Sequence, residues 1–446
     1  MSKDRKAKIN TLPDGNKNSV VRFGIGWWPI LFCLAMFYYY VGLVNDGTNI
    51  VGPAAAKALG VELPTILFLN FVAGMIGIVF FLICGQINKK IGAGKLAGIL
   101  MIITGVAYFG VGQSRSLAMY LICMACVVGS IMSAGYICGG SLVAQWFPKK
   151  KGAVMGYTTM GHNLASATYC IIITATIGAF GFRWGLLPVT TVAVVLGIAA
   201  ILFMRNEPTD YGINPDNVSD EVYQNEYDTT SSVEDDGGWT TKKLLTTKET
   251  WMVALTTGLF QVCSGGIMTQ IVLRNVELGM TQSYALFCMT IVAIIGLCGS
   301  WGIGVLDQKF GTKRTMMLFG LWFGCALLLN FLCKDTGSII FWISFVMIGV
   351  SIGGSANFST SLPAAVFGRH GFGKVNSVVF PIMGAIMACN YLVNMIVQSV
   401  TGGEIRYAYL VFACIAWVNI LLISTVNEHR FNRDWKAEQE KKNKAA

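Results

Sequence analysis

One long polar stretch, residues 205–250, interrupts an otherwise apolar chain of 446 residues. Six apolar segments precede it and six follow. Each is close to the roughly 20 residues that a helix needs to cross a hydrocarbon core about 30 Å thick. This pattern predicts an all-α membrane protein of twelve transmembrane helices in two halves. The predicted spans are residues 25–45, 65–84, 94–112, 117–146, 152–178, 184–204, 251–272, 282–306, 314–333, 337–364, 374–400 and 406–425.

The amino-acid composition agrees with a lipid-embedded chain. Hydrophobic residues make up 54% and charged residues 13% of the sequence, and the mean hydropathy is +0.59. So little charge cannot coat a water-soluble globule of this size. The net charge of +10 does not indicate a nucleic-acid partner, because Lys and Arg lie in short runs between apolar segments.

The placement of these basic residues predicts the topology. With the N-terminus inside, 27 of the 33 Lys and Arg residues fall on the cytoplasmic side, which is a strong positive-inside bias. Both termini are therefore expected in the cytoplasm, and the first apolar segment is expected to be a permanent anchor rather than a cleaved signal peptide. The predicted parts are tails 1–24 and 426–446, bundles 25–204 and 251–425, and linker 205–250. We expect a multi-pass protein of the plasma (inner) membrane.

The linker is acidic through most of its length and is interspersed with Asn, Ser, Thr and Tyr. Such a composition cannot bury enough apolar area to offset the entropy of ordering. We interpret it as a solvated tether that ends in a short amphipathic piece near residues 239–245. A regulatory role for its acids is the alternative.

The two halves repeat one another. A stretch beginning at Gly85 and one beginning at Gly304 share their glycine and lysine pattern, 219 residues apart. Ser141-Leu142-Val143-Ala144 and Ser361-Leu362-Pro363-Ala364 match at a spacing of 220 residues. Two matches at nearly one offset indicate a duplicated six-helix bundle, with a substrate path between the halves.

Here the chain resembles the major facilitator superfamily of secondary transporters. That family carries a motif of glycines, an acid and basic residues in the cytoplasmic turn between helices two and three, where the charges bridge helix ends at the cytoplasmic gate. The chain keeps this pattern in both halves, but Lys89 and Gln308 stand where the family has its acid. The chain keeps Gly85, Lys90 and Gly92 in the first copy and Gly304 and Gly311 in the second, where Asp307 stands one position before the acid's place.

Two further stretches resemble one branch of the superfamily, the monocarboxylate transporters and oxalate/formate antiporters. They are residues 144–156, between helices four and five, and residues 205–215, after helix six. The resemblance implies transport of a small carboxylate by proton symport or by exchange. The antiporters carry cations in helices eight and eleven. Here residues 282–306 contain no Lys or Arg, and residues 374–400 contain only Lys374, at their first position. A monoanion, a zwitterion or a neutral solute is therefore expected rather than a dicarboxylate.

Ionisable residues inside a membrane are costly and usually have a task. His162 lies about ten residues into helix five, or roughly 15 Å along it, close to the midplane. It is a candidate to couple protons to transport or to donate a hydrogen bond to a carboxylate. The alternative is a neutral histidine bonded to a neighbouring helix.

Asp46 follows the apolar part of helix one, and Asn45, Thr48 and Asn49 lie beside it. It is a candidate to carry a proton or to close the outer gate by pairing with Arg274 from the other half. The alternative is an interfacial acid in water, because depth cannot be fixed from sequence.

Further polar residues fall at mid-depth. Single residues of this kind are often packing contacts between helices, but several lie in helices one, four, seven and ten, which line the path in the resembled superfamily. We expect them to form a hydrogen-bonding cavity. The candidate substrate-binding residues, with His162, are Tyr39, Tyr40, Tyr136, Gln261, Gln270, Asn357, Asn390 and Tyr391.

No nucleotide, nucleophile or metal motif is evident, so an enzyme is not expected, and neither is a metal or other cofactor. The thirteen cysteines lie in or beside apolar segments, where they are expected to pack as free thiols. The expected partners are a small-molecule solute and the lipid bilayer, and we expect a monomer. A channel and a multidrug exporter of the same fold are the alternatives, the exporter favouring cations.

Overall fold

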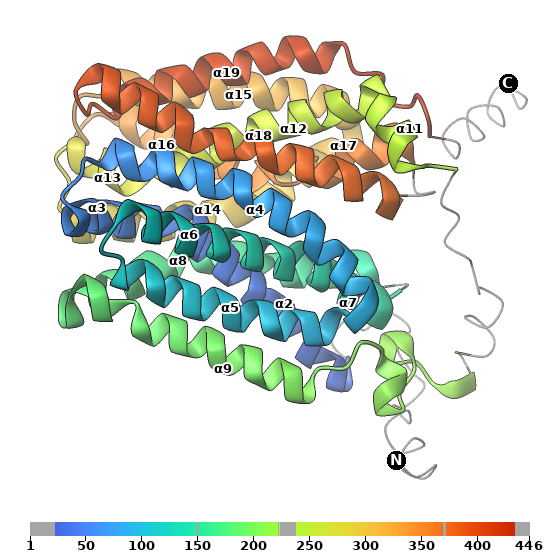
Figure 1. Ribbon diagram of the computed structural model, residues 1–446. Coiled ribbons are helices and arrows are strands. Elements are labelled where there is room, and N and C mark those ends of the chain that lie inside the picture. The colour runs from blue at the N-terminus through green and yellow to red at the C-terminus, as the bar shows by residue number, and fades with distance from the viewer. Residues whose placement is uncertain (1–22, 149, 222, 224–237, 369–371, 433–446) are drawn as a thin grey trace, which may run out of the picture. The chain divides into compact units, whose positions relative to one another are not determined.

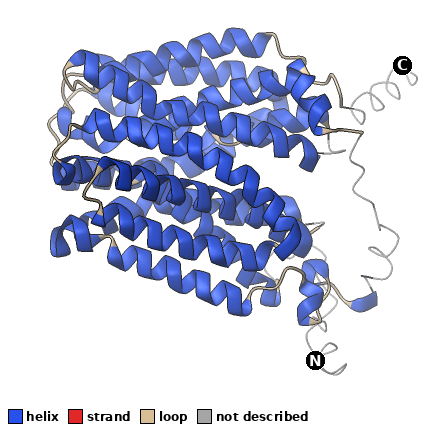
Figure 2. Ribbon diagram, viewed as in Figure 1, coloured by secondary structure: helices blue, strands red, loops and turns tan. Residues whose placement is uncertain are grey.

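The computed structural model describes residues 23–148, 150–221, 223, 238–368 and 372–432 (Figure 1). The described part is helical and contains no strand (Figure 2). In the first half the helices are α2 (Trp27–Tyr40), α3 (Thr48–Leu59), α4 (Leu63–Ile91), α5 (Ala93–Gln113), α6 (Leu117–Met132), α7 (Gly140–Trp146), α8 (Lys151–Gly185) and α9 (Leu187–Phe203).

The second half begins with a short amphipathic helix, as expected from its sequence. Its helices are α11 (Thr241–Thr246), α12 (Lys248–Met268), α13 (Ile271–Glu277), α14 (Gln282–Phe310), α15 (Thr312–Leu332), α16 (Ile339–Ser355), α17 (Phe358–Phe367), α18 (Phe372–Thr401) and α19 (Arg406–Ser424). Part of the acidic linker, at residues 222 and 224–237, lies outside the described residues.

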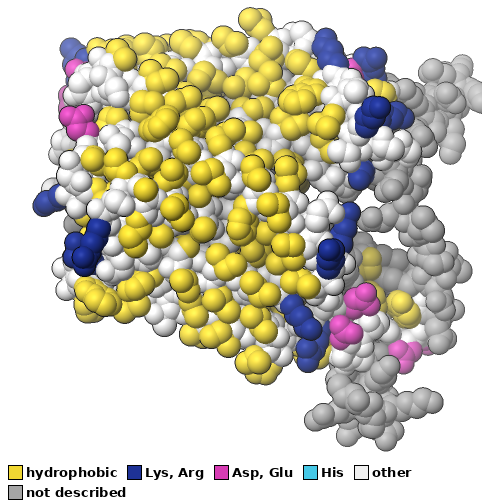
Figure 3. Space-filling model, viewed as in Figure 1, with side chains coloured by type: hydrophobic (Ala, Val, Ile, Leu, Met, Phe, Trp, Pro, Cys, Tyr) yellow, Lys and Arg dark blue, Asp and Glu magenta, His cyan; other side chains and the backbone are white. Residues whose placement is uncertain are grey.

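The helix lengths fit the predicted spans. Among the described residues, ten helical stretches are long and apolar enough to cross a membrane, and α16 with α17 adds one more as a pair bent by 45°. The remaining predicted span corresponds to α9, an apolar helix of 17 residues. Many large apolar side chains on these helices are exposed, among them Trp301, Val106 and Val195. Figure 3 shows such side chains across the drawn face, with Lys and Arg near the helix ends.

Contacts between residues divide the chain into two compact units that differ from the two sequence halves. The first unit contains residues 1–44, 76–165 and 172–233. The second contains residues 234–446 together with 45–75 and 166–171 of the first half. The far end of the first span, the start of α4 and a short piece of α8 therefore pack with helices of the second half.

The same helix pairing recurs inside each unit. In the first unit α5 packs closely on α9, where a Cβ atom at Gly98 would lie 2.7 Å from the carbonyl oxygen of Gly197. In the second unit the equivalent helices α15 and α19 meet at Gly320, where a Cβ atom would lie 3.2 Å from the carbonyl oxygen of Ala416. Small residues allow helix backbones to approach closely in membranes. The repeat seen in the sequence is thus also present in the packing.

The glycine motifs differ from the predicted turns. Residues 85–91 continue α4 and residues 304–310 continue α14, so only Gly92 and Gly311 separate each helix from the next. Both glycines have a φ of +83°, a conformation that side-chain-bearing residues rarely adopt. The turn between the two helices is therefore a single glycine, shorter than the motif predicted.

Candidate functional site

Irregular backbone interrupts each of the four helices expected to line a path. In chain order these are helix one (α2 and α3), helix four (α6 and α7), helix seven (α12 and α13) and helix ten (α16 and α17). Helices one and four have π-helical turns at residues 41–46 and 133–139. Helix seven breaks at residues 269–270 and helix ten at residues 356–357. The irregular stretch of helix four, shifted by the 220-residue repeat, falls on the break of helix ten. Irregular backbone at membrane depth is tolerated where it is buried in protein or lines a cavity, and π-turns are frequent at functional sites.

In the first unit, His162 lies among aromatic side chains. The ring of Phe37 meets the imidazole edge-on at 4.8 Å between centroids, and the Tyr40 ring lies 6.2 Å away. Tyr136, from the π-turn of helix four, packs on both Phe37 and Tyr40 at 5.4 and 5.3 Å. The Nε2 atom of His162 is buried and has no hydrogen-bond partner among the described residues. We call Phe37, Tyr40, Tyr136 and His162 the imidazole cluster.

The imidazole cluster depends on a close contact between α8 and α2. Gly161 precedes His162, and a Cβ atom there would lie 2.2 Å from the carbonyl oxygen of Leu34. Only glycine permits this approach. Tyr39 is not part of the cluster, because its hydroxyl donates to the carbonyl of Val189 in α9 at 2.9 Å.

In the second unit, Asp46 is 1% exposed. Its Oδ2 atom accepts a hydrogen bond from the Ser166 hydroxyl at 2.6 Å, while Oδ1 is buried without a partner among the described residues. Its backbone carbonyl accepts from the Cys170 thiol at 3.1 Å and from Asn49 Nδ2 at 2.9 Å. Asp46 is therefore a buried acid with one oxygen available. The partners Ser166 and Cys170 were not anticipated from sequence, since they lie 120 and 124 residues away.

The proposed pair of Asp46 with Arg274 is not present. Arg274 is 2% exposed, and its guanidinium donates to Glu277 at 2.7 Å, to the side chain and carbonyl of Asn330 at 3.1 and 2.8 Å, and to the carbonyl of Cys333 at 3.1 Å. The carbonyl groups at the end of α15 lack helical partners, and they take up these donors. Arg274 ties α13 to α15.

Helix eleven, which is α18, carries two of the predicted residues, and one of them, Tyr391, lies near Asp46. The Tyr391 side chain is hydrogen-bonded to that of Thr48 and lies within electrostatic range of Asp46. Asn390 is fully buried, beside Gly265 of α12, and neither its Oδ1 nor its Nδ2 has a partner among the described residues. Buried polar atoms without partners are uncommon in proteins, so Asn390 stays a candidate contact for a solute.

The remaining candidates join helices within the second unit. Gln270, at the break of helix seven, accepts a hydrogen bond from Gln398 Nε2 at 3.0 Å, and its own Nε2 is unpaired among the described residues. Gln261 donates to the Ser359 hydroxyl at 3.3 Å. Asn357, at the break of helix ten, donates to the carbonyl of Ser300 at 2.7 Å and accepts from its hydroxyl at 3.0 Å. Asn357 thus anchors its helix break to α14.

Gly92 and Gly311 each precede a helix, α5 and α15. In both helices a side chain from a segment distant in the sequence caps the first turn. The amide of Gly94 donates to Asn206 Oδ1 at 2.9 Å, and the amide of Lys313 donates to Glu428 Oε1 at 3.1 Å. Asn206 and Glu428 both follow the last helix of their half. Lys90 is exposed, and Asp307 keeps one buried oxygen without a partner among the described residues. Gly85 and Gly304 allow only loose contacts.

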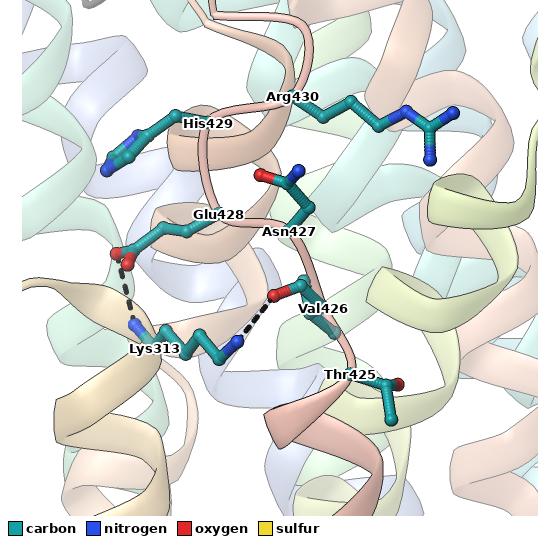
Figure 4. Close-up of a pocket in the computed structure, with 7 residues that line it drawn as sticks. All are labelled: Lys313, Thr425, Val426, Asn427, Glu428, His429 and Arg430. Atoms are coloured by element: carbon teal, nitrogen blue, oxygen red, sulfur yellow. Dashed lines mark hydrogen bonds between the residues drawn. The ribbon is translucent and has the colours of Figure 1, made fainter.

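Glu428 belongs to a surface pocket formed by the segment after α19 (Figure 4). Lys313 enters it from α15, and its Nζ atom donates to the carbonyls of Ser424 and Val426 at 2.7 and 2.8 Å. The pocket is open and contains none of the predicted substrate residues. No group of three or more His, Cys, Asp and Glu within the described ranges is arranged to bind a metal.

Comparisons with known proteins identify the family of this chain. The family model of the Major Facilitator Superfamily matches residues 27–389, more than three quarters of the sequence. The chain belongs to this superfamily. The match spans both halves and includes both motif glycines, Gly92 and Gly311, so the departures at Lys89 and Gln308 do not affect membership.

Among its relatives, an uncharacterized MFS-type transporter of Escherichia coli, YhjX, is 20% identical over 312 residues, covering 69% of this chain and 72% of YhjX. An Arabidopsis thaliana protein named as a putative glycerol-3-phosphate transporter is 26% identical over 176 residues, but the chain covers only 31% of its length. The crystal structure of a D-xylose-proton symporter superposes with a TM-score of 0.67 at 14% identity, covering 91% of this chain and 98% of the symporter. These likenesses establish a membrane transporter fold.

Proposed function

We propose that this transporter moves a small organic solute by alternating access, that the solute is a monocarboxylate or a related organic anion, and that transport is coupled to a proton or to exchange. The observation that carries this proposal is the buried Nε2 atom of His162, which has no partner among the described residues. The Tyr40 ring lies beside the imidazole, and Tyr136 packs on Tyr40. An imidazole nitrogen is a hydrogen-bond donor when protonated and an acceptor when neutral. A carboxylate that arrives with its proton therefore finds a partner in either state.

The charges of the described side chains favour a single negative charge on the solute. Arg274 was the other candidate cation, and its donors are engaged by Glu277, Asn330 and Cys333. A buried dianion without paired cations carries a large desolvation cost. A monoanion that is neutralised by one proton avoids most of it.

Asp46 is proposed as a second proton-carrying group. Its Oδ2 atom is held by Ser166, and its buried Oδ1 atom is without a partner among the described residues. A buried carboxyl that must change its surroundings during a transport cycle is suited to bind and release a proton. In this proposal the protein lies in the plasma membrane with both termini in the cytoplasm, acts as a monomer, and uses residues 205–250 as a tether.

The same Asp46 favours a second candidate. A buried, unpaired carboxylate oxygen attracts an ammonium group, so a zwitterionic or cationic solute is the alternative, including the lipophilic cations of multidrug exporters. The xylose symporter that shares the fold adds neutral sugars to the solutes worth testing. The two candidates differ in the residue that recognises the charged group, His162 for an anion and Asp46 for a cation.

The test is transport in proteoliposomes with a pH-sensitive dye inside. The panel comprises monocarboxylates, dicarboxylates, amino acids, betaines, pentoses and lipophilic cations, at pH 5.5 and 7.5. We expect saturable uptake of monocarboxylates with internal acidification. We also expect His162→Gln, which keeps a hydrogen-bonding amide but cannot titrate, to reduce uptake and flatten its pH dependence.

Thr290 of α14 provides a matched control. Its hydroxyl donates to the backbone carbonyl of Ala167, which lies in α8, the helix that also carries His162. We expect Thr290→Val to change uptake much less than His162→Gln at either pH. Uptake of cations alone, abolished by Asp46→Asn and not by His162→Gln, would replace the anion proposal with the second candidate. Uptake of no member of the panel would overturn both.

A further inference from the structure

Helix seven is interrupted at a place where one regular hydrogen bond is replaced. In an α-helix the carbonyl of residue i accepts from the amide of residue i+4. Met268 and Val272 are such a pair, but α12 ends at Met268 and α13 begins at Ile271. Between them, Gln270 has a φ of −129° and a ψ of −1°, which takes the chain out of the helical conformation.

The side-chain amide of Asn49 occupies this gap. Its Nδ2 atom donates to the carbonyl oxygen of Met268 at 2.6 Å, and its Oδ1 atom accepts from the amide of Val272 at 3.0 Å. One carboxamide thus satisfies the acceptor and the donor that a continuous helix would have paired with each other. Among side chains, only Asn and Gln carry both groups in this planar arrangement.

Asn49 is well placed to act in this way because its own surroundings are fixed. It is 1% exposed and stands in the first turn of α3, directly after the π-turn that ends at Asp46. Its Nδ2 atom also donates to the carbonyl of Asp46, whose carboxyl group accepts from Ser166. These contacts join helix one, helix five and helix seven inside the second unit. Removal of one partner would leave buried polar groups unsatisfied, which is costly.

We propose that Asn49, Met268 and Val272 form a latch that gates the solute path by holding helix seven in one of two states. With the latch closed, helix seven is broken and Asn49 bridges the break. When the latch opens, Asn49 withdraws, and Met268 and Val272 pair directly, which makes α12 and α13 continuous. Both backbone groups of helix seven stay paired in either state, because one helical hydrogen bond between Met268 and Val272 takes the place of the two that Asn49 makes. Asn49 is a positioning residue that acts on the solute path through helix seven.

This inference rests on alternating access and not on the identity of the solute. It can therefore be tested without a substrate. Cys170 provides a natural reporter, because its thiol is buried and donates to the Asp46 carbonyl beside the latch. Cys263 provides the reference, because it is fully buried in the same unit but donates to the Phe412 carbonyl.

The experiment measures labelling of the full chain in nanodiscs with a charged, water-soluble maleimide, followed by mass spectrometry of each cysteine. Asn49→Leu removes both the donor and the acceptor, and Asn49→Asp removes the donor. We expect Asn49→Leu to raise the labelling rate of Cys170 by about tenfold, which corresponds to 1.4 kcal/mol in the opening equilibrium, while Cys263 stays unchanged. Asn49→Asp is expected to change Cys170 in the same direction.

Asn419 provides a matched control variant. It is also a fully buried asparagine, and its Nδ2 atom donates to a backbone carbonyl of α12, that of Thr256, at 2.8 Å. We expect Asn419→Leu to lower thermal stability as much as Asn49→Leu without faster labelling of Cys170. Unchanged labelling of Cys170 in folded Asn49→Leu protein would overturn the latch. An equal rise at Cys170 and Cys263 would also overturn it, because it would indicate general loosening. Neither result depends on whether a monocarboxylate is transported.

Discussion

Glu428 caps the helix that begins at Thr312, accepting the backbone amide of Lys313 at 3.1 Å. An acid at a helix N-terminus satisfies an orphan amide and interacts favourably with the helix dipole. The family motif has an acid where Gln308 stands in this chain. Here the carboxylate of Glu428, from the segment after α19, places a negative charge at the start of α15 instead.

We expect Glu428→Ala to lower the melting temperature, since a lost helix cap costs about 1 kcal/mol. Glu428→Gln keeps an acceptor and is expected to lose only part of this. Differential scanning fluorimetry of the purified protein measures both. Glu404, which pairs with Arg406 at the surface, is the control, and Glu404→Ala should change stability little. An equal loss in the two alanine variants would contradict the capping role.

Arg274 is expected to stabilise the protein rather than bind solute. Its donors are engaged by Glu277, Asn330 and Cys333, and hydrogen bonds to charged groups contribute about 1.5–3 kcal/mol each. Arg274→Lys retains the charge but not the fork of donors. We therefore expect a large loss of thermal stability in Arg274→Lys, with the Michaelis constant of the residual transport unchanged. A weakened apparent affinity for solute at normal stability would restore Arg274 to the binding site.

The sequence predicted the spans, their duplication and the superfamily because these depend on local composition and on spacing along the chain. It did not predict the breaks in helices seven and ten. Gln270 is a good helix former, and a single Asn such as Asn357 is only mildly unfavourable in a helix. The break at Gln270 is bridged by Asn49, a residue about 220 positions earlier. Arg274 was assigned to the wrong partner for the same reason, since the carbonyls of Asn330 and Cys333 become available only where α15 ends in the folded protein.

Tyr39 and Tyr40 are neighbours in helix one but are expected to differ in function. Tyr39 donates to the Val189 carbonyl, whereas Tyr40 packs against Tyr136 and His162. Tyr39→Phe should therefore lower the free energy of unfolding by roughly 0.5–1.5 kcal/mol, the net contribution of one hydrogen bond, and so lower the melting temperature. The solute affinity of the folded protein should stay unaltered. Tyr40→Phe should instead weaken transport at nearly normal stability. Scanning fluorimetry and uptake assays on the two variants distinguish these effects, and identical behaviour of both would exclude the division.

Gly161 offers the most direct test of the contact that positions His162. A Cβ atom at residue 161 would lie 2.2 Å from the carbonyl oxygen of Leu34, and backbone cannot yield as a flexible side chain does. Gly161→Ala should therefore push α8 away from α2, displace the imidazole from Phe37 and Tyr40, and abolish most transport.

Gly156 lies on the same helix, and a Cβ atom there would have no neighbour within 4 Å. Gly156→Ala is therefore expected to be neutral or slightly stabilising, because alanine favours helices by about 1 kcal/mol over glycine. Uptake and scanning fluorimetry of both variants measure the difference. Normal transport by Gly161→Ala would mean that the imidazole cluster does not need this helix contact, and His162 would lose its place in the proposed mechanism.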